Sequence, residues 1–210
     1  MADLIRGLSA PKIRENLARI RDEVGPDVEV LAAVKYVAAA ELVVLAEAGI
    51  TLVGENRAQA LAEKQAAGPD LFTWDFIGHL QSRKVKDVVP RVRYLHSVAT
   101  DSVLGQLKAH ATPETRVLVE VNVAGDPSKG GVAPAQLDDF IARCPVTVAG
   151  LMTMPPLADR AEDSRRWFAA LAQLAAERGL RELSMGTTQD YTVAAQEGAT
   201  IVRIGSRLLR

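Results

Sequence analysis

The chain has 210 residues, of which 48% are hydrophobic, enough for the core of one large domain or two small ones. Its net charge of −1 gives no indication of a nucleic-acid partner or a membrane surface, and no apolar run is long enough to span a bilayer. A single cysteine, Cys144, excludes an intrachain disulfide and favours a cytoplasmic protein.

A helix is predicted before the first strand, because apolar residues recur at helical spacing from Ile13 to Val24. Eight short apolar segments of strand length follow: Glu29–Val34, Ile50–Val53, Thr73–Ile77, Tyr94–Ser97, Arg116–Val123, Val146–Leu151, Glu182–Met185 and Thr200–Ile204. Helices are predicted between them over Ala38–Ala48, Arg57–Ala67, Lys84–Val89, Ser102–Ala111, Pro134–Arg143, Glu162–Arg178 and Tyr191–Glu197. Asp101 is the predicted N-cap of the helix Ser102–Ala111.

This alternation of strands and helices predicts parallel strands joined by right-handed helical crossovers. Eight such units favour a closed (β/α)₈ barrel over an open sheet. We expect residues 1–210 to form one barrel domain, with the first helix as an addition to it.

Polar and glycine residues collect at the carboxyl ends of the predicted strands, where (β/α)₈ barrels carry their active sites. Each has an ordinary structural explanation when taken alone, but together they predict a site on one rim. They are Lys35, Asn56, His79, Gln81, Asn122, Met152, Thr187, Thr188, Gly205 and Ser206. The three histidines have no zinc-site spacing, so we expect no metal.

Lys35 ends the first apolar strand abruptly. A lysine amine that can lose its proton is a nucleophile, and with an aldehyde it forms a Schiff base. The alternative is that the stem of Lys35 lies along apolar surface while its amine is solvated.

The segments that follow strands seven and eight have the composition of a phosphate site. Gly186-Thr187-Thr188 and Gly205-Ser206 offer backbone N–H groups and hydroxyls, and Arg203 could add a charge-assisted hydrogen bond. Alternatively, Arg203 lies inside the barrel and pairs with a carboxylate. A phosphate site beside a strand-end lysine suggests pyridoxal phosphate, which carries both an aldehyde and a phosphate.

The chain resembles the pyridoxal phosphate homeostasis proteins, single-domain relatives of the alanine racemase barrel, over almost its whole length. The resemblance is carried by Ala33-Val34-Lys35, Gly54-Glu55-Asn56 with Gln59, Phe76-Ile77-Gly78-His79-Leu80-Gln81 with Lys84, Val121-Asn122, Ser128-Lys129 with Gly131, Gly150-Leu151-Met152, Ser184-Met185-Gly186 with Asp190, and Val202-Arg203-Ile204-Gly205.

The resemblance implies that Lys35 carries the cofactor as a Schiff base. It implies that the phosphate is held by Thr188, Arg203, Gly205 and Ser206, that Asn56 and His79 lie near the ring, and that Met152, Ser184, Gly186 and Thr187 complete the cofactor-binding set. The family usually has methionine and serine where this chain has Thr187 and Thr188. Thr188 keeps the hydroxyl, whereas Thr187 replaces a large apolar side chain.

Racemases of this barrel class use a lysine and, from a second domain, a tyrosine as their two bases. This chain has no room for that domain, and Tyr36, Tyr94 and Tyr191 are not expected at the second position. We therefore expect a monomer without catalytic residues that binds pyridoxal phosphate reversibly in intracellular homeostasis, with apo-enzymes that use the cofactor as candidate partners.

Two alternatives remain open at this point. One is a small racemase-like enzyme that uses pyridoxal phosphate, with Lys35 on one face and water or His79 on the other. The other is an aldolase-type enzyme that uses Lys35 without a cofactor and holds a sugar phosphate in the anion site.

Overall fold

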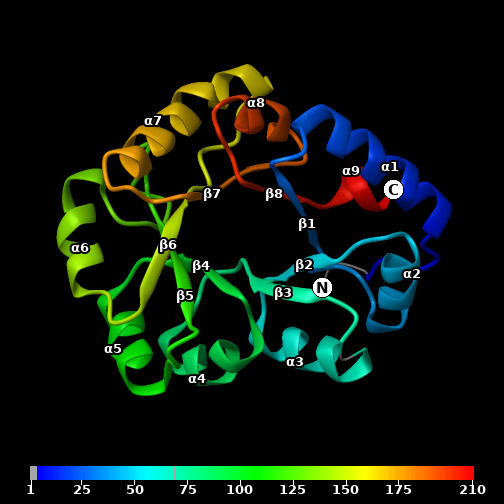
Figure 1. Cartoon of the computed structure of the whole chain (residues 1–210), viewed down its shortest axis with the longest axis horizontal. Coiled ribbons are helices and arrows are strands. Elements are labelled where there is room, and N and C mark those ends of the chain that lie inside the picture. Colours follow the sequence, from blue (N-terminus) through cyan, green and yellow to red (C-terminus); the bar gives the residue numbers. More distant parts are fainter. Residues whose placement is uncertain (1–3, 69) are drawn as a thin grey trace.

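The computed structural model describes residues 4–68 and 70–210. Eight parallel strands close into a barrel in sequence order, with β1 paired to β8, and helices surround it (Figure 1). The strands are β1 Glu29–Ala33, β2 Leu52–Glu55, β3 Thr73–Phe76, β4 Tyr94–Val98, β5 Arg116–Glu120, β6 Thr147–Met152, β7 Glu182–Thr187 and β8 Ile201–Ile204. The predicted (β/α)₈ barrel is confirmed.

Helices cover the outside of the barrel (Figure 1). They are α1 Ala10–Val24, α2 Leu42–Glu47, α3 Ala58–Ala67, α4 Val85–Val88, α5 Asp101–His110, α6 Leu137–Arg143, α7 Arg165–Ala176, α8 Tyr191–Gln196 and α9 Ser206–Leu209. The additional helix is α1, which packs beside α8 and α9 (Figure 1). The buried amide of Asn16 in α1 donates to the carbonyl oxygens of Leu208 and Arg210, which ties the end of the chain to its beginning.

Several element boundaries differ from the predicted ones. β7 continues through Gly186 and Thr187 because Thr187 still pairs with Arg203 of β8, and Met152 is the last residue of β6. Helix α5 is capped by Thr100 rather than Asp101, since the Thr100 hydroxyl accepts the Val103 N–H at 3.3 Å. Propensity alone could not place these limits, because they depend on pairing between strands and on local hydrogen bonds.

Apolar side chains fill most of the barrel interior. Its buried cluster consists of Leu31, Leu52, Tyr94, Leu118, Met152 and Ile201, and a larger cluster packs between the barrel and the helices. Asp75, His96 and Ser184 are fully buried, and the interior therefore has to satisfy polar groups as well.

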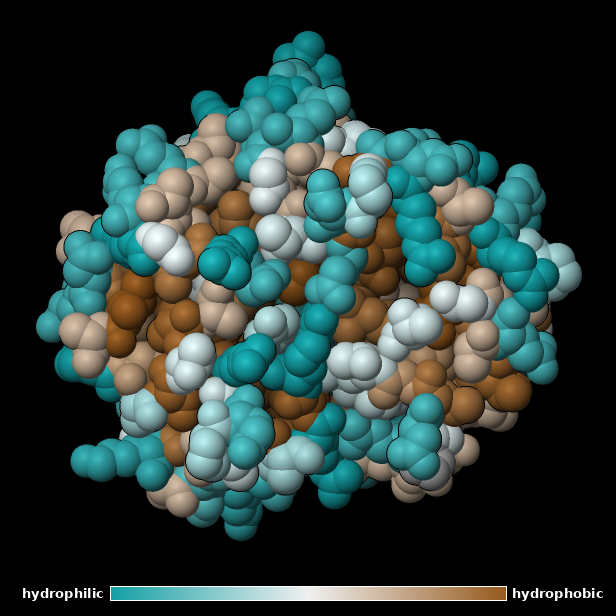
Figure 2. All heavy atoms as spheres, viewed as in Figure 1, coloured by the Kyte–Doolittle hydropathy of each residue, from teal (hydrophilic) through white to brown (hydrophobic). Residues whose placement is uncertain are grey.

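Among residues 4–68 and 70–210, no helix is both long and apolar enough to cross a membrane. In the view of Figure 2, hydrophilic side chains project around the outline of the molecule, and hydrophobic side chains lie deeper between them.

Candidate functional site

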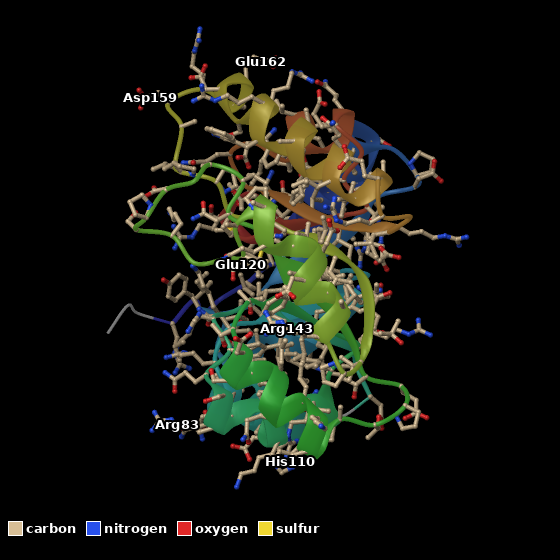
Figure 3. The ribbon with its side chains drawn as sticks, turned by 90° about the vertical axis from the view of Figure 1, so that its left-hand side faces the viewer. Arg83, His110, Glu120, Arg143, Asp159 and Glu162 are labelled. Atoms are coloured by element: carbon tan, nitrogen blue, oxygen red, sulfur yellow. The ribbon has the colours of Figure 1, made fainter. Side chains whose placement is uncertain are left out.

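The carboxyl ends of β1, β2, β7 and β8 surround a cavity of about 600 Å³, which we call the mouth cavity. Its volume is typical of sites for small molecules. The predicted residues that line it are Lys35, Asn56, Thr187, Thr188, Arg203, Gly205 and Ser206. Figure 3 shows Arg83 and Asp159, from the connections after β3 and β6, projecting from the same side of the barrel.

Lys35 lies two residues beyond β1 and is half-buried. The peptide before it is fixed by a hydrogen bond from the Val34 N–H to the Gly54 carbonyl oxygen at 3.0 Å. The Lys35 Nζ lies 4.8 Å from the centroid of the Tyr36 ring, in a cation–π contact. Within the described chain no carboxylate pairs with this amine, so it is available to a ligand in the cavity.

Asn56 lines the cavity and carries a buried hydrogen-bond acceptor that has no partner. Its Oδ1 is the one buried side-chain oxygen or nitrogen among the described residues that has no partner. An unpaired buried acceptor costs about 1–3 kcal/mol, so this position favours a ligand that can donate. The backbone of Asn56 is fixed, since its N–H donates to the Glu55 Oε1 at 2.7 Å.

A buried ion pair connects the segments that carry Lys35 and Asn56. The Nζ of Lys64 lies 2.5 Å from the Glu55 Oε2 and donates to the Val34 carbonyl oxygen at 2.5 Å. Glu55 precedes Asn56 and Val34 precedes Lys35. The contacts of Lys64 therefore fix the carboxyl ends of β1 and β2 relative to each other.

Hydroxyl and backbone groups gather at the ends of β7 and β8. The Thr188 Oγ1 accepts the Gly205 N–H at 3.2 Å, and Ser206 follows directly at the start of α9. Thr187 donates its N–H to Asp190 Oδ1 at 2.7 Å, which fixes the turn before α8. The hydroxyls of Thr188 and Ser206 beside the Gly205 backbone form a cradle that could donate to an anion.

Arg203 lies inside the barrel at the floor of the mouth cavity, where it is 6% exposed. Its guanidinium donates to Ser184 Oγ at 2.5 Å, to the Thr153 carbonyl oxygen at 2.9 Å and to the Met154 sulfur at 2.9 Å. None of the described carboxylates forms an ion pair with it, so the predicted alternative of a directly paired interior arginine is not what the structure has. Burial lowers the pKa of Arg203 to about 10, against the opposing effect of Glu120 and Asp190.

The unpaired guanidinium makes the floor of the cavity electropositive. Arg203 also lines a neighbouring cavity of about 480 Å³, which shares Thr187 and Thr188 with the mouth cavity. A buried positive charge without an anionic partner favours an anionic ligand.

Four of the eleven residues implied to bind the cofactor lie outside the mouth cavity, as do Gln81 and Asn122 of the predicted rim. His79 is exposed on the rim and lines a separate depression with Gln81. Met152 belongs to the apolar interior, Ser184 is buried beneath Arg203, and Gly186 lines the neighbouring cavity. The sequence places all four near strand ends, but only the strand register decides which side of the rim each one faces.

Some site residues were not predicted from the sequence. Tyr36 and Met154 line the mouth cavity, although neither was among the predicted site residues. Glu120 ends β5 half-buried, and burial raises its pKa while Arg203 and His79 lower it. An acidic residue at the end of a buried strand was the signal for Glu120, whereas loop residues such as Met154 gave none.

Comparison with known proteins places this geometry in a family. The alanine racemase N-terminal domain family matches residues 8–209. The pyridoxal phosphate homeostasis protein of Aquifex aeolicus is 40% identical over 174 residues, covering 76% of each chain.

Solved structures agree with this match. PipY of Synechococcus elongatus, solved with pyridoxal phosphate bound, superposes with a TM-score of 0.82 at 31% identity, covering 94% of this chain and 100% of PipY. An alanine racemase of Corynebacterium glutamicum is 14% identical with a TM-score of 0.75, covering 96% of this chain and 60% of that one. This last likeness is one of fold alone.

Proposed function

This chain belongs to the pyridoxal phosphate homeostasis proteins of the alanine racemase N-terminal domain family, and on this premise we propose that it binds pyridoxal phosphate reversibly in the mouth cavity. The observation that carries the proposal is one cavity that combines an amine, an unpaired acceptor and an anion cradle. These are Lys35, the Oδ1 of Asn56, and the group formed by Thr188, Gly205 and Ser206.

The residues present fit the cofactor at both of its reactive ends. The aldehyde of pyridoxal phosphate gives an imine with a primary amine and releases water, and hydrolysis reverses this. Lys35 would supply that amine, which makes the link covalent but reversible. Thr188 and Ser206 would donate hydrogen bonds to the phosphate, Gly205 would let the backbone approach it closely, and Arg203 would supply positive charge from beneath.

We further propose that the protein carries the cofactor without strong turnover. Two observations support carriage over racemisation. His79, which the racemase alternative offers beside water as the second base, is exposed in a separate depression, and Tyr36 contacts Lys35 itself instead of facing it across the cavity. Residues 1–210 would act as one monomeric domain in the cytoplasm, with cofactor-requiring apo-enzymes as recipients.

Absorption spectroscopy with borohydride tests this proposal. The purified protein with pyridoxal phosphate should show a visible band that borohydride removes, leaving a reduced adduct that mass spectrometry maps to Lys35. Lys35→Ala should give no adduct. A protein that stays colourless at saturating cofactor would contradict the proposal and support a sugar-phosphate enzyme, whereas fast amino-acid racemisation that Lys35→Ala abolishes would support the racemase alternative.

A further inference from the structure

A continuous chain of buried polar groups lies directly beneath Arg203. The Ser184 Oγ accepts the Arg203 Nη1 at 2.5 Å and lies 2.8 Å from the Nδ1 of His96. The Nε2 of His96 lies 3.0 Å from the Oδ2 of Asp75, which in turn receives the Nη2 of Arg93 at 2.7 Å. We call these groups the interior chain.

The interior chain crosses the barrel from one end to the other. Arg203 lies at the mouth cavity on β8, Ser184 on β7, His96 on β4 and Asp75 on β3. Arg93 precedes β4, and its Nη1 donates to both carboxylate oxygens of Glu29, the first residue of β1, at 2.9 Å. The middle three side chains are fully buried, the Arg93–Glu29 end is partly exposed to solvent, and Arg203 at the other end borders the mouth cavity.

The geometry determines the direction of each hydrogen bond. Asp75 accepts from Arg93 and from the Tyr94 N–H, which identifies it as a carboxylate and requires His96 to donate from Nε2. A neutral His96 then has an unprotonated Nδ1, which accepts the Ser184 hydroxyl proton. The Ser184 oxygen is therefore left with its lone pairs toward the Arg203 guanidinium.

Protonation of His96 at Nδ1 would disturb this arrangement. Nδ1–H and the Arg203 N–H would then both donate to the Ser184 oxygen, and the Ser184 hydroxyl proton would have no acceptor. A second positive charge would also be buried beside Arg203, which is unfavourable without a partner. The charged groups that face His96 are Asp75, Arg93 and Arg203, and only Asp75 favours a cationic imidazole.

We propose that Ser184, His96 and Asp75 are positioning residues that hold Arg203 in the orientation in which it faces the mouth cavity. This inference rests on the proposed function, because it assigns the interior chain to the binding of the phosphorylated cofactor. Aliphatic residues would fill these buried positions at lower electrostatic cost, as they do in the apolar part of the interior. A polar chain that ends on an unpaired arginine at a ligand cavity therefore indicates a role in binding.

The first test needs no cofactor. Nitrogen-15 NMR of the unliganded protein at pH 7 should show His96 as the neutral Nε2–H tautomer. Asp75→Asn should increase the share of the Nδ1–H tautomer, because it removes the carboxylate that accepts the Nε2–H of His96. A cationic His96 at pH 7, or an Nδ1–H tautomer in the unchanged protein, would contradict the proposed directions of the hydrogen bonds in the interior chain.

The second test is a double-mutant cycle on the dissociation constant of pyridoxal phosphate, measured by absorbance. Ser184→Ala should weaken binding about tenfold, the effect of one hydrogen bond to a charged group. In an Arg203→Gln background the same substitution should change affinity less than about twofold, because its effect passes through Arg203. Equal losses in both backgrounds would refute the positioning role.

Thr115→Ala is the matched control for loss of a buried hydroxyl, since Thr115 lies at the opposite end of the barrel and its hydroxyl bonds only to Thr112 among the described residues. It should leave the affinity unchanged, and thermal melts of each unliganded variant exclude misfolding as the cause of a loss. If the unchanged protein binds no pyridoxal phosphate, the proposed function fails, and the NMR result still decides the polarity of the interior chain.

Discussion

At the scale of single residues, Lys35 is half-buried and its amine makes few contacts that would stabilise the fold. Its amine contacts the Tyr36 ring and has no hydrogen bond or ion pair in the described structure. Lys35→Ala should therefore abolish borohydride-trapped cofactor while changing the free energy of unfolding by no more than about 0.5 kcal/mol. Urea denaturation of the unliganded protein measures the second quantity, and a large loss of stability would show that Lys35 is structural.

Arg203 is the opposite case, since it is buried and has three partners. Arg203→Gln removes the positive charge that favours an anion, so retention of pyridoxal phosphate should weaken by about 1.5–3 kcal/mol. Equilibrium dialysis gives this difference. Arg143→Gln is the control, because Arg143 lines neither of the two cavities and pairs with Asp101. Unchanged retention in Arg203→Gln would exclude Arg203 from cofactor binding.

Gly78 shows how a residue without a side chain positions the site. A Cβ added at Gly78 would lie 2.2 Å from the backbone carbonyl oxygen of Asn56, so the two strand ends would have to separate. Gly78→Ala should cost about 1–3 kcal/mol of stability and weaken cofactor retention, because it displaces Asn56.

Gly105 in α5 provides the comparison for Gly78. A Cβ there meets no atom within 4 Å, and alanine in a helix interior is favoured over glycine by about 0.5–1 kcal/mol. Gly105→Ala should therefore stabilise the protein and leave retention unchanged. If Gly78→Ala behaves like Gly105→Ala, close packing at Gly78 does not position Asn56.

At the scale of elements, the Glu55–Lys64 pair connects α3 to the carboxyl ends of β1 and β2. Both side chains are almost fully buried. Lys64→Met should lower the free energy of unfolding by about 3–5 kcal/mol, because it leaves the Glu55 carboxylate buried without its partner. Chemical denaturation measures this loss.

The double variant Glu55→Gln, Lys64→Met separates two explanations of that loss. If the cost comes from an unpaired buried charge, removing the charge as well should restore part of the stability. Alternatively, the double variant could lose as much free energy of unfolding as Lys64→Met and Glu55→Gln lose separately, added together. That result would mean that the loss comes from packing of the lysine stem instead.

Sequence patterns predict the elements well because each one depends on local properties. Apolar runs such as Arg116–Glu120 and the helical spacing from Ile13 to Val24 record burial directly, and parallel alternation leaves few topologies. Strand-end chemistry likewise predicts Lys35, Asn56 and Thr188 at one cavity.

What the sequence could not predict depends on groups brought together across the barrel. Asp75 and His96 are unremarkable in their own strands, and their roles arise only because Ser184 and Arg203 project into the same interior. His79 faces a separate depression for a reason of the same kind, since the direction of a rim side chain depends on the turn that carries it.

At the scale of the whole molecule, the interior chain makes stability depend on pH. Burial lowers the pKa of His96 below its ordinary value, so between about pH 6.5 and the lower folded pKa the unfolded chain binds more protons than the folded one. Burial favours protonation of Asp75, but hydrogen bonds from His96 and Arg93 outweigh it and hold the pKa below its usual range.

The free energy of unfolding should therefore fall as the pH is lowered from 7 to 5, and fall again below about pH 4 as Asp75 is protonated. The contribution of His96 is bounded by about 1.4 kcal/mol per pH unit. Urea titrations at half-unit intervals, compared with His96→Phe, isolate it, because the phenylalanine variant lacks this titration and should have a shallower slope from pH 7 to 5. Identical slopes would mean that His96 takes up its proton in the folded barrel as easily as in the unfolded chain. That result would contradict the inference that a neutral imidazole lies beneath Arg203.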